Sequence, residues 1–205
     1  MIGQEYTDED GENATKMARR AIEEYIDIKL IVKNSYGGKF VEKRGVFTTL
    51  TTSSGKLRGC VGFPEPLFPL GEAVIKSAIS AASSDPRFPP VTKEEMDDMT
   101  VEVSMLSKPV ALAVKNRKDL PSMIAVGRDG LIAERDSFSG LLLPQVAVEE
   151  KMDQKAFLKA VCWKAGMEPD CWKDDDTSIS TFNAEVFYEV EPRGPVFRKV
   201  LSAEK

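Results

Sequence analysis

Short connections between strand-like segments limit the folds open to this chain more than any other feature. Residues 45–52 and 56–61 carry many β-branched or alternating apolar residues, and Ser53-Ser54-Gly55 between them is typical of a turn. These two segments therefore predict an antiparallel hairpin. Residues 100–105 alternate cleanly between apolar and polar side chains, which predicts a half-buried strand that ends at Ser107-Lys108-Pro109.

Helical periodicity marks the longer segments between these strands. Thr7 is placed to cap a helix that reaches about Ile28, because acidic residues follow it in the first turn. Further helices are expected over residues 70–83 and over residues 153–166, where Asp153 begins the helix and Gly166 ends it. Thr92 opens a short helix through a capping box.

The second half of the chain predicts more strands. Residues 124–133 resemble a hairpin whose turn is Gly127-Arg128-Asp129-Gly130, since an Asp-Gly step supplies positive φ. Residues 141–143 and 183–190 are expected to be strands, and the tail around Val196 packs as a strand or lies loose.

The order of these elements predicts the fold class. At least seven strands with mostly short antiparallel connections indicate an α+β fold, in which helices pack on antiparallel sheets, rather than an alternating βαβ fold. No repeat or long linker interrupts the chain, so residues 1–205 are expected to be one domain with its core at about 7–190. The polar stretch 109–119 is the expected boundary if the domain has two closely associated subdomains.

The charge balance excludes some classes of function. The formal net charge is -5, so the chain lacks the basic footprint of a nucleic-acid-binding protein, and nucleic acid is disfavoured as a partner. No apolar run approaches the length of a membrane span, and the start of the chain lacks the pattern of a signal peptide. We therefore expect a soluble, cytoplasmic protein without membrane contact.

The sequence also restricts the available chemistry. It contains no histidine, which removes the usual catalytic bases and most zinc sites, and no metal or cofactor is expected. Its three cysteines form no C-x-x-C pair, so a disulfide scaffold is not expected. Cys162 lies on the apolar stripe of a helix, and Cys171 lies beside Trp172, so both are expected to be packing residues.

The hexapeptide Leu57-Arg58-Gly59-Cys60-Val61-Gly62 is the strongest candidate site. Strand alternation places Arg58, Cys60 and Gly62 on one face. A guanidinium favours the nucleophilic thiolate of a neighbouring cysteine, and glycine inside a strand marks a bulge or the close approach of a backbone or ligand. Cys60 is therefore a candidate catalytic residue, and Arg58, Gly59 and Gly62 are candidate binding residues. The alternative is that Cys60 is a small buried packing residue.

Other polar residues are candidates for the same site. Asp85 and Arg87 lie in a proline-stiffened loop, either as binding residues or as a carboxylate that caps a turn and an arginine that pairs with a carboxylate. Glu102 is the best available base and Ser104 a binding residue if their strand face lines a cleft; otherwise both face solvent. Gln145 either binds a ligand or satisfies backbone groups.

Several ordered motifs together resemble the AMMECR domain family. The hexapeptide matches its signature, with Val61 where isoleucine is usual. The resemblance runs from about Thr7 to Tyr188, and the further matching segments are Asp85-Pro86-Arg87-Phe88-Pro89-Pro90, Val101-Glu102-Val103-Ser104, Gly127-Arg128-Asp129-Gly130-Leu131-Ile132, Gly140-Leu141-Leu142-Leu143-Pro144-Gln145-Val146-Ala147 and the region from Phe157-Leu158 to Trp172. At Lys151-Met152 the chain departs from relatives, which often carry an aromatic residue there.

The resemblance implies an α+β protein of two closely associated subdomains, in a family whose function is not established. In prokaryotes the family accompanies a Memo-like protein and a radical-SAM protein, which suggests a component of a shared pathway. Two functions are consistent with the residues. One is a thiol-assisted enzyme with a cleft around the hexapeptide, and the other is a non-catalytic binding or adaptor protein that uses the same surface.

Overall fold

The computed structural model describes residues 5–200, which divide into two compact units. The first unit comprises residues 5–106 together with Glu185–Lys199, and the second comprises Ser107–Ala184 with Val200. The chain therefore leaves the first unit after Leu106 and returns to it within a single long strand.

Most of the helices lie where their periodicity and caps predict them. The first unit contains α1 Asp8–Ile28, the 3-10 helix η1 Gly38–Val41, β1 Val46–Thr52, β2 Leu57–Phe63, α2 Leu70–Ser83, the 3-10 helix η2 Glu94–Asp98, β3 Met99–Leu106, β8 Val196–Lys199 and the end of β7 Ser178–Glu189. The second unit contains the start of β7 together with β4 Val110–Ala111, η3 Arg117–Asp119, α3 Leu120–Met123, β5 Asp129–Arg135, β6 Phe138–Leu142, α4 Pro144–Glu149, α5 Gln154–Lys164 and η4 Cys171–Lys173.

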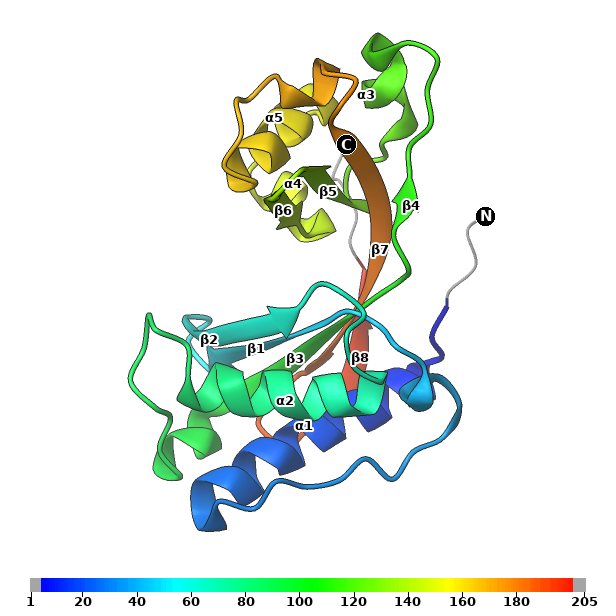
Figure 1. Cartoon of the computed structure of the whole chain (residues 1–205). Helices are drawn as coiled ribbons and strands as arrows, with labels where there is room; N and C mark the ends of the chain where they lie inside the picture. Colours follow the sequence, from blue (N-terminus) through cyan, green and yellow to red (C-terminus); the bar gives the residue numbers. More distant parts are fainter. Residues whose placement is uncertain (1–4, 201–205) are drawn as a thin grey trace. The chain divides into compact units, whose positions relative to one another are not determined.

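The sheet confirms the predicted α+β class. Its strand order is β2-β1-β3-β7-β5-β6, with β4 and β8 also paired to β7, and the β1–β2, β1–β3, β5–β6 and β5–β7 pairs are antiparallel. In the first unit α1 and α2 lie on the same face of the strands (Figure 1). Leu50, Val101 and Val103 are fully buried in the core of this unit.

Helix α1 is capped as its sequence predicts. The side-chain oxygen of Thr7 accepts a hydrogen bond from the Asp10 amide at 3.1 Å, and the Asp10 carboxylate accepts from the Thr7 amide at 2.9 Å. One face of the helix is buried, and on it Arg19 forms a buried ion pair with Glu189 of β7. This pair fastens the helix to the sheet across 170 residues of sequence.

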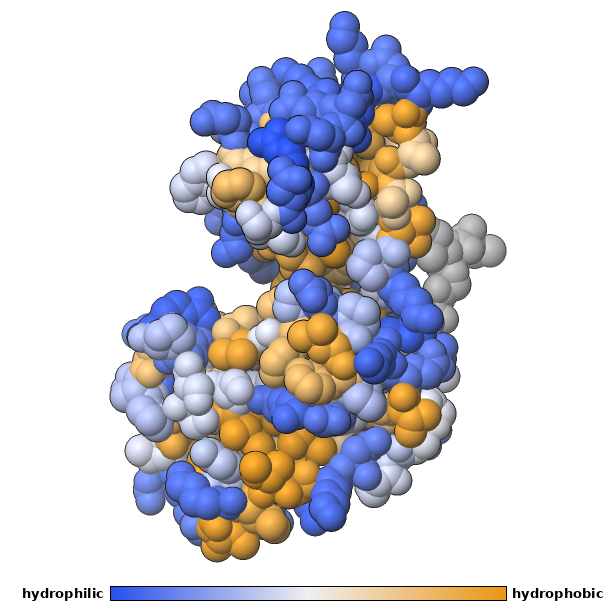
Figure 2. Space-filling view, viewed as in Figure 1, coloured by the Kyte–Doolittle hydropathy of each residue, from blue (hydrophilic) through white to orange (hydrophobic). Residues whose placement is uncertain are grey.

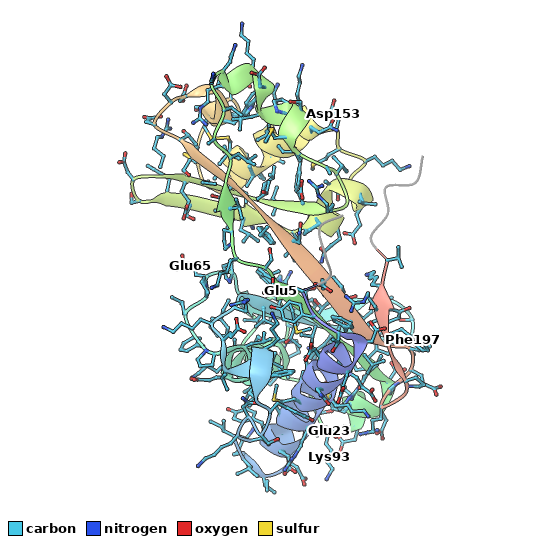
Figure 3. The ribbon with its side chains drawn as sticks, turned by 90° about the vertical axis from the view of Figure 1, so that its right-hand side faces the viewer. Glu5, Glu23, Glu65, Lys93, Asp153 and Phe197 are labelled. Carbon is cyan, nitrogen blue, oxygen red and sulfur yellow. A yellow bond between two sulfur atoms is a disulfide. The ribbon has the colours of Figure 1, made fainter. Side chains whose placement is uncertain are left out.

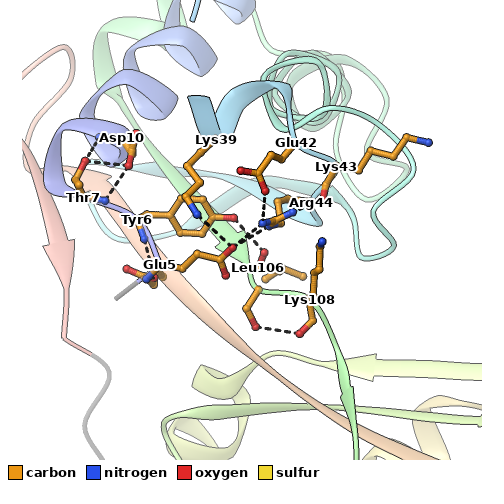
Figure 4. A network of polar contacts seen from close by, with 12 residues as sticks. Glu5, Tyr6, Thr7, Asp10, Lys39, Glu42, Lys43, Arg44, Leu106 and Lys108 are labelled. Atoms are coloured by element: carbon orange, nitrogen blue, oxygen red, sulfur yellow. Dashed lines mark hydrogen bonds and ion pairs between the residues drawn. The ribbon is translucent and has the colours of Figure 1, made fainter. Parts of the chain in front are cut away.

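A polar network holds the segment before α1 in place (Figure 4). The Arg44 side chain donates to Glu5 at 2.8 and 3.0 Å and to Glu42 at 2.6 Å. The Tyr6 hydroxyl donates to the Leu106 carbonyl at 3.2 Å, and burial raises the pKa of this tyrosine well above its usual range. Both charged and uncharged contacts thus hold this segment against the sheet.

The cysteines of the second unit correct one expectation. Cys162 and Cys171 are buried, as predicted, but they are joined by a disulfide with an S–S distance of 2.09 Å. The bond links the last turns of α5 to η4, beside a core that contains Phe157, Leu158 and Trp172. The expectation failed because it treated each cysteine by its own neighbours, whereas the turn at Gly166 folds the chain back on the helix.

The predicted hairpin over residues 124–133 is also wrong. Ile124 to Val126 form no strand, and the Asp129 carboxylate accepts a hydrogen bond from the Ala125 amide at 2.8 Å. The Asp-Gly step therefore begins β5 instead of forming the turn of a hairpin. The actual hairpin joins β5 to β6 through Asp136, whose φ of 53° lies in the left-handed region.

Apolar surface is gathered over the region of α1 and α2 in the first unit (Figure 2). Ile31 and Val41 are exposed there, and with Val32 and Ile75 they line a hollow of about 420 Å³. Nothing in the structure shows what covers this hollow.

Candidate functional site

The hexapeptide forms β2, the strand at one end of the sheet path in the first unit. Its register pairs Cys60 with Thr49 and Gly62 with Phe47 of β1, and the register shifts between Leu50 and Thr51. A bulge of this kind was anticipated from the two glycines. The predicted strand, its partner and the antiparallel turn between them are confirmed.

The proline-stiffened loop covers the outer edge of β2 at Cys60. The Cys60 amide donates to the Asp85 carboxylate at 2.8 Å, and the Cys60 carbonyl accepts from Arg87 at 3.2 Å. These two side chains replace the neighbouring strand that an edge residue lacks. Because unpaired edge groups invite pairing with other chains, this contact protects the edge as well as fixing the loop.

Asp85 and Arg87 form a strongly coupled ion pair. Arg87 donates to Asp85 through its backbone amide at 3.1 Å and through its guanidinium at 2.9 and 2.7 Å. The Arg87 guanidinium therefore holds the pKa of the buried Asp85 carboxyl well below its usual range, and the Cys60 amide adds to this effect. Asp85 is ionised at neutral pH and is fully occupied by protein donors.

Arg58 is paired separately. Its guanidinium donates to both oxygens of Glu95, at 2.9 and 3.1 Å, and to the Pro89 carbonyl at 2.9 Å. Arg58 in turn lowers the pKa of Glu95. The Phe88 ring has the Arg58 guanidinium carbon 5.9 Å and the Arg87 carbon 5.5 Å from its centroid. Both arginines thus hold the loop to the strand.

The sulfur of Cys60 accepts a hydrogen bond from the neighbouring strand. Cys60 is half-buried and free, and the Thr49 hydroxyl donates to its Sγ at 3.4 Å. Asp85 and, to a smaller extent, the Cys60 side chain raise the pKa of Arg87, because both lie beside its guanidinium. Arg87, which donates to the Cys60 carbonyl, is therefore the arginine that contacts Cys60, whereas Arg58, which the sequence suggested, pairs with Glu95.

Glu102 lies in the same cross-strand row as Cys60 but not beside it. Thr49 of β1 pairs with Cys60 on one side and with Glu102 on the other. Neighbouring strands are about 4.8 Å apart, so Cys60 and Glu102 are separated by roughly 10 Å of sheet. The Glu102 carboxylate also pairs with Lys199 at 3.1 Å. A proton therefore has no direct path from Cys60 to Glu102.

Protein atoms occupy the space beside the two glycines. A Cβ at Gly59 would lie 2.2 Å from the Ala81 carbonyl of α2, and a Cβ at Gly62 would lie 2.3 Å from the Phe47 ring. The absence of side chains allows α2 and Phe47 to approach, which accounts for both glycines without a ligand. Ser104 of β3 pairs with Phe47 of β1 and is buried.

Gln145 lies in α4, in the second unit. Its amide oxygen Oε1 is buried and accepts no hydrogen bond from the described residues. The expected backbone partner is therefore not found for this oxygen among the described residues, and the expected ligand contact stays a prediction.

Three residues join this group that sequence reasoning missed. Thr49, Glu95 and Lys199 contact Cys60, Arg58 and Glu102, respectively. Glu95 carried a signal, since its place in the Thr92 capping box put a carboxylate near the loop, and its side chain accepts from the Thr92 amide at 2.8 Å. Thr49 was detectable only through the exact register of the hairpin.

Two hollows of the first unit lie at other residues. One of about 260 Å³ is lined by residues of α1 together with Lys93 and Arg193, and the other is the apolar hollow at Ile31 and Val41. Within residues 5–200, no three His, Cys, Asp or Glu side chains gather as a metal site, and no helix is long and apolar enough to cross a bilayer.

The fold and the hexapeptide strand together define a class of α+β protein in which Asp85 and Arg87 of a loop bind the backbone of the edge strand β2. The family model described as AMMECR1 matches residues 15–187. The chain belongs to this family, as the motifs predicted.

Relatives of nearly equal length support the assignment. Protein TK0174 of Thermococcus kodakarensis is 51% identical over 200 residues, covering 95% of this chain and 97% of that protein. Protein MJ0810 of Methanocaldococcus jannaschii is 51% identical over 194 residues, covering 94% and 96%. The crystal structure of uncharacterized protein PH0010 from Pyrococcus horikoshii superposes with a TM-score of 0.85 at 49% identity, covering 93% of this chain and 97% of that one.

Proposed function

We propose that this chain is a binding protein. Its contact surface is the cross-strand row that runs from Cys60 of the hexapeptide through Thr49 of β1 to Glu102 of β3. The observation that carries the proposal is the distribution of polar groups. Asp85, Arg58 and Arg87 are paired with protein atoms and support the loop. Cys60 and Thr49 are half-buried on the sheet face opposite to α2, where they retain capacity for further hydrogen bonds.

The row suits a protein partner better than a deeply enclosed substrate. It runs across three strands of a sheet face rather than into a depression between helices, and the hollows at Lys93 and at Ile31 lie at other residues. The family resemblance makes Memo-like and radical-SAM proteins the first partners to test. A cytoplasmic location belongs to the same proposal.

Calorimetry with the Memo-like and radical-SAM proteins of the same organism tests the adaptor role. We expect Glu102→Lys and Thr49→Lys to weaken binding at least tenfold, because each places a new ammonium group in the row. Glu12→Lys, at an exposed position of α1, makes the same charge change as Glu102→Lys and is the matched control. Binding that is absent, or equally weakened by the control, would refute the adaptor role.

A thiol-assisted enzyme is the second candidate, and the Thr49 hydrogen bond to the sulfur favours it. In that function the Cys60 thiol loses its proton to water, because Glu102 is too distant, and the thiolate adds to a carbonyl carbon of the substrate, whose C=O π electrons move onto the oxygen. Alkylation with iodoacetamide between pH 5 and 10 distinguishes the two. Rapid labelling of Cys60 at a pH below that at which an ordinary cysteine thiol ionises, abolished in Cys60→Ala, supports the enzyme. Labelling with the pH dependence of an ordinary thiol, or no labelling, supports the binding protein.

A further inference from the structure

The second unit contains a hollow of about 530 Å³ with an unusual concentration of positive charge. Lys118, Lys155, Lys159 and Lys173 line it, against a single lining carboxylate, that of Asp153. The chain as a whole has a net charge of -5, so the charge of this hollow is opposite in sign to that of the molecule. We propose that the hollow binds a small, multiply charged, phosphate-bearing anion.

The carboxylates near the hollow leave part of its charge uncompensated. Asp170 pairs with Lys173 at 3.0 Å and lies 3.9 Å from Lys159. Lys118 and Lys155 form no ion pair with a carboxylate of residues 5–200. Two ammonium groups thus remain for an anion, and lysine is a common phosphate ligand in proteins.

The start of α5 adds to the positive potential. Asp153 lies at this end of the helix (Figure 3), and its carboxylate accepts a hydrogen bond from the Ala156 amide at 2.7 Å. Lys155 and Ala156, in the first turn, line the hollow. Helix N-termini favour anions because their amides point outward without partners, although here Asp153 already occupies one of them.

Trp172 forms a buried part of the wall of the hollow. Its side chain is 4% exposed and lines the hollow, but its indole N–H has no hydrogen-bond partner among the described residues. A buried donor without an acceptor does not recover the hydration that it lost on folding. This nitrogen is itself shielded from solvent, so an anion in the open hollow is not its acceptor, and the four lysines carry the recognition.

The chemistry selects phosphate groups rather than a nucleobase. The volume lies within the usual range for small-molecule sites, roughly 300–1,000 Å³. Trp172 is buried and has Lys173 over its ring at 5.3 Å, so it offers no open face on which a base could stack. The affinity is therefore expected to reside in the phosphates.

Tryptophan fluorescence and calorimetry on the full chain test this site. The sequence has two tryptophans, and Trp163 is 75% exposed, so Trp163→Phe leaves Trp172 as the reporter. At constant ionic strength, pyrophosphate and ATP are expected to bind saturably with similar affinity, and adenosine is expected not to bind. These three probes separate phosphate recognition from base recognition.

A matched pair of variants assigns the binding to the hollow. Lys118→Gln combined with Lys155→Gln should raise the dissociation constant for pyrophosphate at least tenfold. Lys164→Gln, on the same helix but outside the hollow, should leave it unchanged. No saturable binding by either method, or equal weakening by both sets, would overturn the proposal. A single-stranded DNA oligomer that binds more tightly than ATP would overturn it too, because the surface would then recognise nucleic acid.

Discussion

Asp85 is the residue at which a single charge has the clearest structural effect. Its pKa is lowered in the folded protein by Arg87, so stability rises with pH over the range in which the unfolded chain holds a proton that the native carboxylate has released. This stability is fully present above about pH 4, the ordinary pKa of aspartate, and is lost as the pH falls toward the lower native value.

We therefore expect Asp85→Asn to destabilise the protein by about 1–3 kcal/mol at pH 7, since the Cys60 amide and Arg87 lose a charged acceptor. Urea unfolding at pH 7, 5 and 3 should show the difference from wild type shrinking at the lowest pH. Glu65→Gln, at an exposed carboxylate (Figure 3), is the control and should have little effect. A difference that grows toward pH 3 would contradict this assignment of the charge.

The buried pair of Arg19 and Glu189 predicts a larger effect. Arg19 also donates to the Met96 carbonyl at 3.2 Å, and Glu189 accepts from the Val101 amide at 3.0 Å. Removing one partner leaves a buried charge, so Arg19→Met should cost about 3–5 kcal/mol in the free energy of unfolding. Arg20→Met, at an exposed position on the same helix, should cost far less. Equal losses of unfolding free energy in the two variants, measured by chemical denaturation, would show that the buried pair stabilises the protein no more than an exposed arginine does.

At the scale of elements, Gly59 determines how closely α2 packs on β2. A methyl group there would lie 2.2 Å from the Ala81 carbonyl, and a backbone atom has little freedom to move. Gly59→Ala should therefore lower stability by roughly 1–3 kcal/mol, the usual cost of overpacking. Gly37→Ala is the matched control, because no atom lies within 4 Å of its Cβ position and its φ is -95°. Thermal unfolding of both variants compares them; an unchanged midpoint for Gly59→Ala would mean that α2 shifts freely.

The disulfide makes the second unit sensitive to reductant. Cys162 and Cys171 are separated by 9 residues, and closing a loop of that length stabilises a protein by about 2–3 kcal/mol in the chain-entropy description. Dithiothreitol should therefore lower the unfolding midpoint of the wild type. It should not affect the double variant Cys162→Ala with Cys171→Ala, whereas Cys60→Ala should respond as the wild type does. A wild type indifferent to the reductant would argue against the bond.

The elements show where sequence reasoning reaches its limit. Helices α1, α2 and α5 were predictable because local caps and apolar periodicity determine them. The 124–133 segment was not, since a Gly-Arg-Asp-Gly turn also suits a loop that leads into a strand, and only pairing with β7 decides between them. The disulfide likewise depends on the chain reversal at Gly166, and the spacing of the cysteines in the sequence does not predict that reversal.

The candidate site was predictable to a similar degree. Strand alternation predicted Arg58 and Cys60 on one face, but the register shift leaves Arg58 without a paired residue on β1. The proline-stiffened loop does bring Asp85 and Arg87 to the hexapeptide. The partners of these groups could not be predicted, because Glu95 reaches Arg58 through tertiary packing. Each arginine pairs with a carboxylate and supports the loop, and a ligand contact at either one stays a prediction.

At the scale of the whole molecule, the chain joins its two units through neighbouring strands. Composition suggested a boundary near residues 109–119, but the chain leaves the first unit after Leu106 and re-enters at Glu185, inside β7. The chain returns to the first unit inside a continuous strand, which has the composition of a strand and not of a linker, so the sequence does not reveal this boundary. At the crossing, the Ser107 amide donates to the Asn183 carbonyl at 2.9 Å.

This geometry predicts that the first unit folds without the second. Ser107 and Asn183 are neighbours, so a two-residue Asn-Gly turn, which suits hairpins, can replace residues 108–182. The variant should unfold cooperatively in urea, with roughly two-thirds of the wild-type m-value because it exposes less surface. The same variant with Leu50→Asp, which places a charge in the core, should show no transition. Loss of cooperative unfolding in the unmutated deletion variant would mean that the first unit requires the second in order to fold.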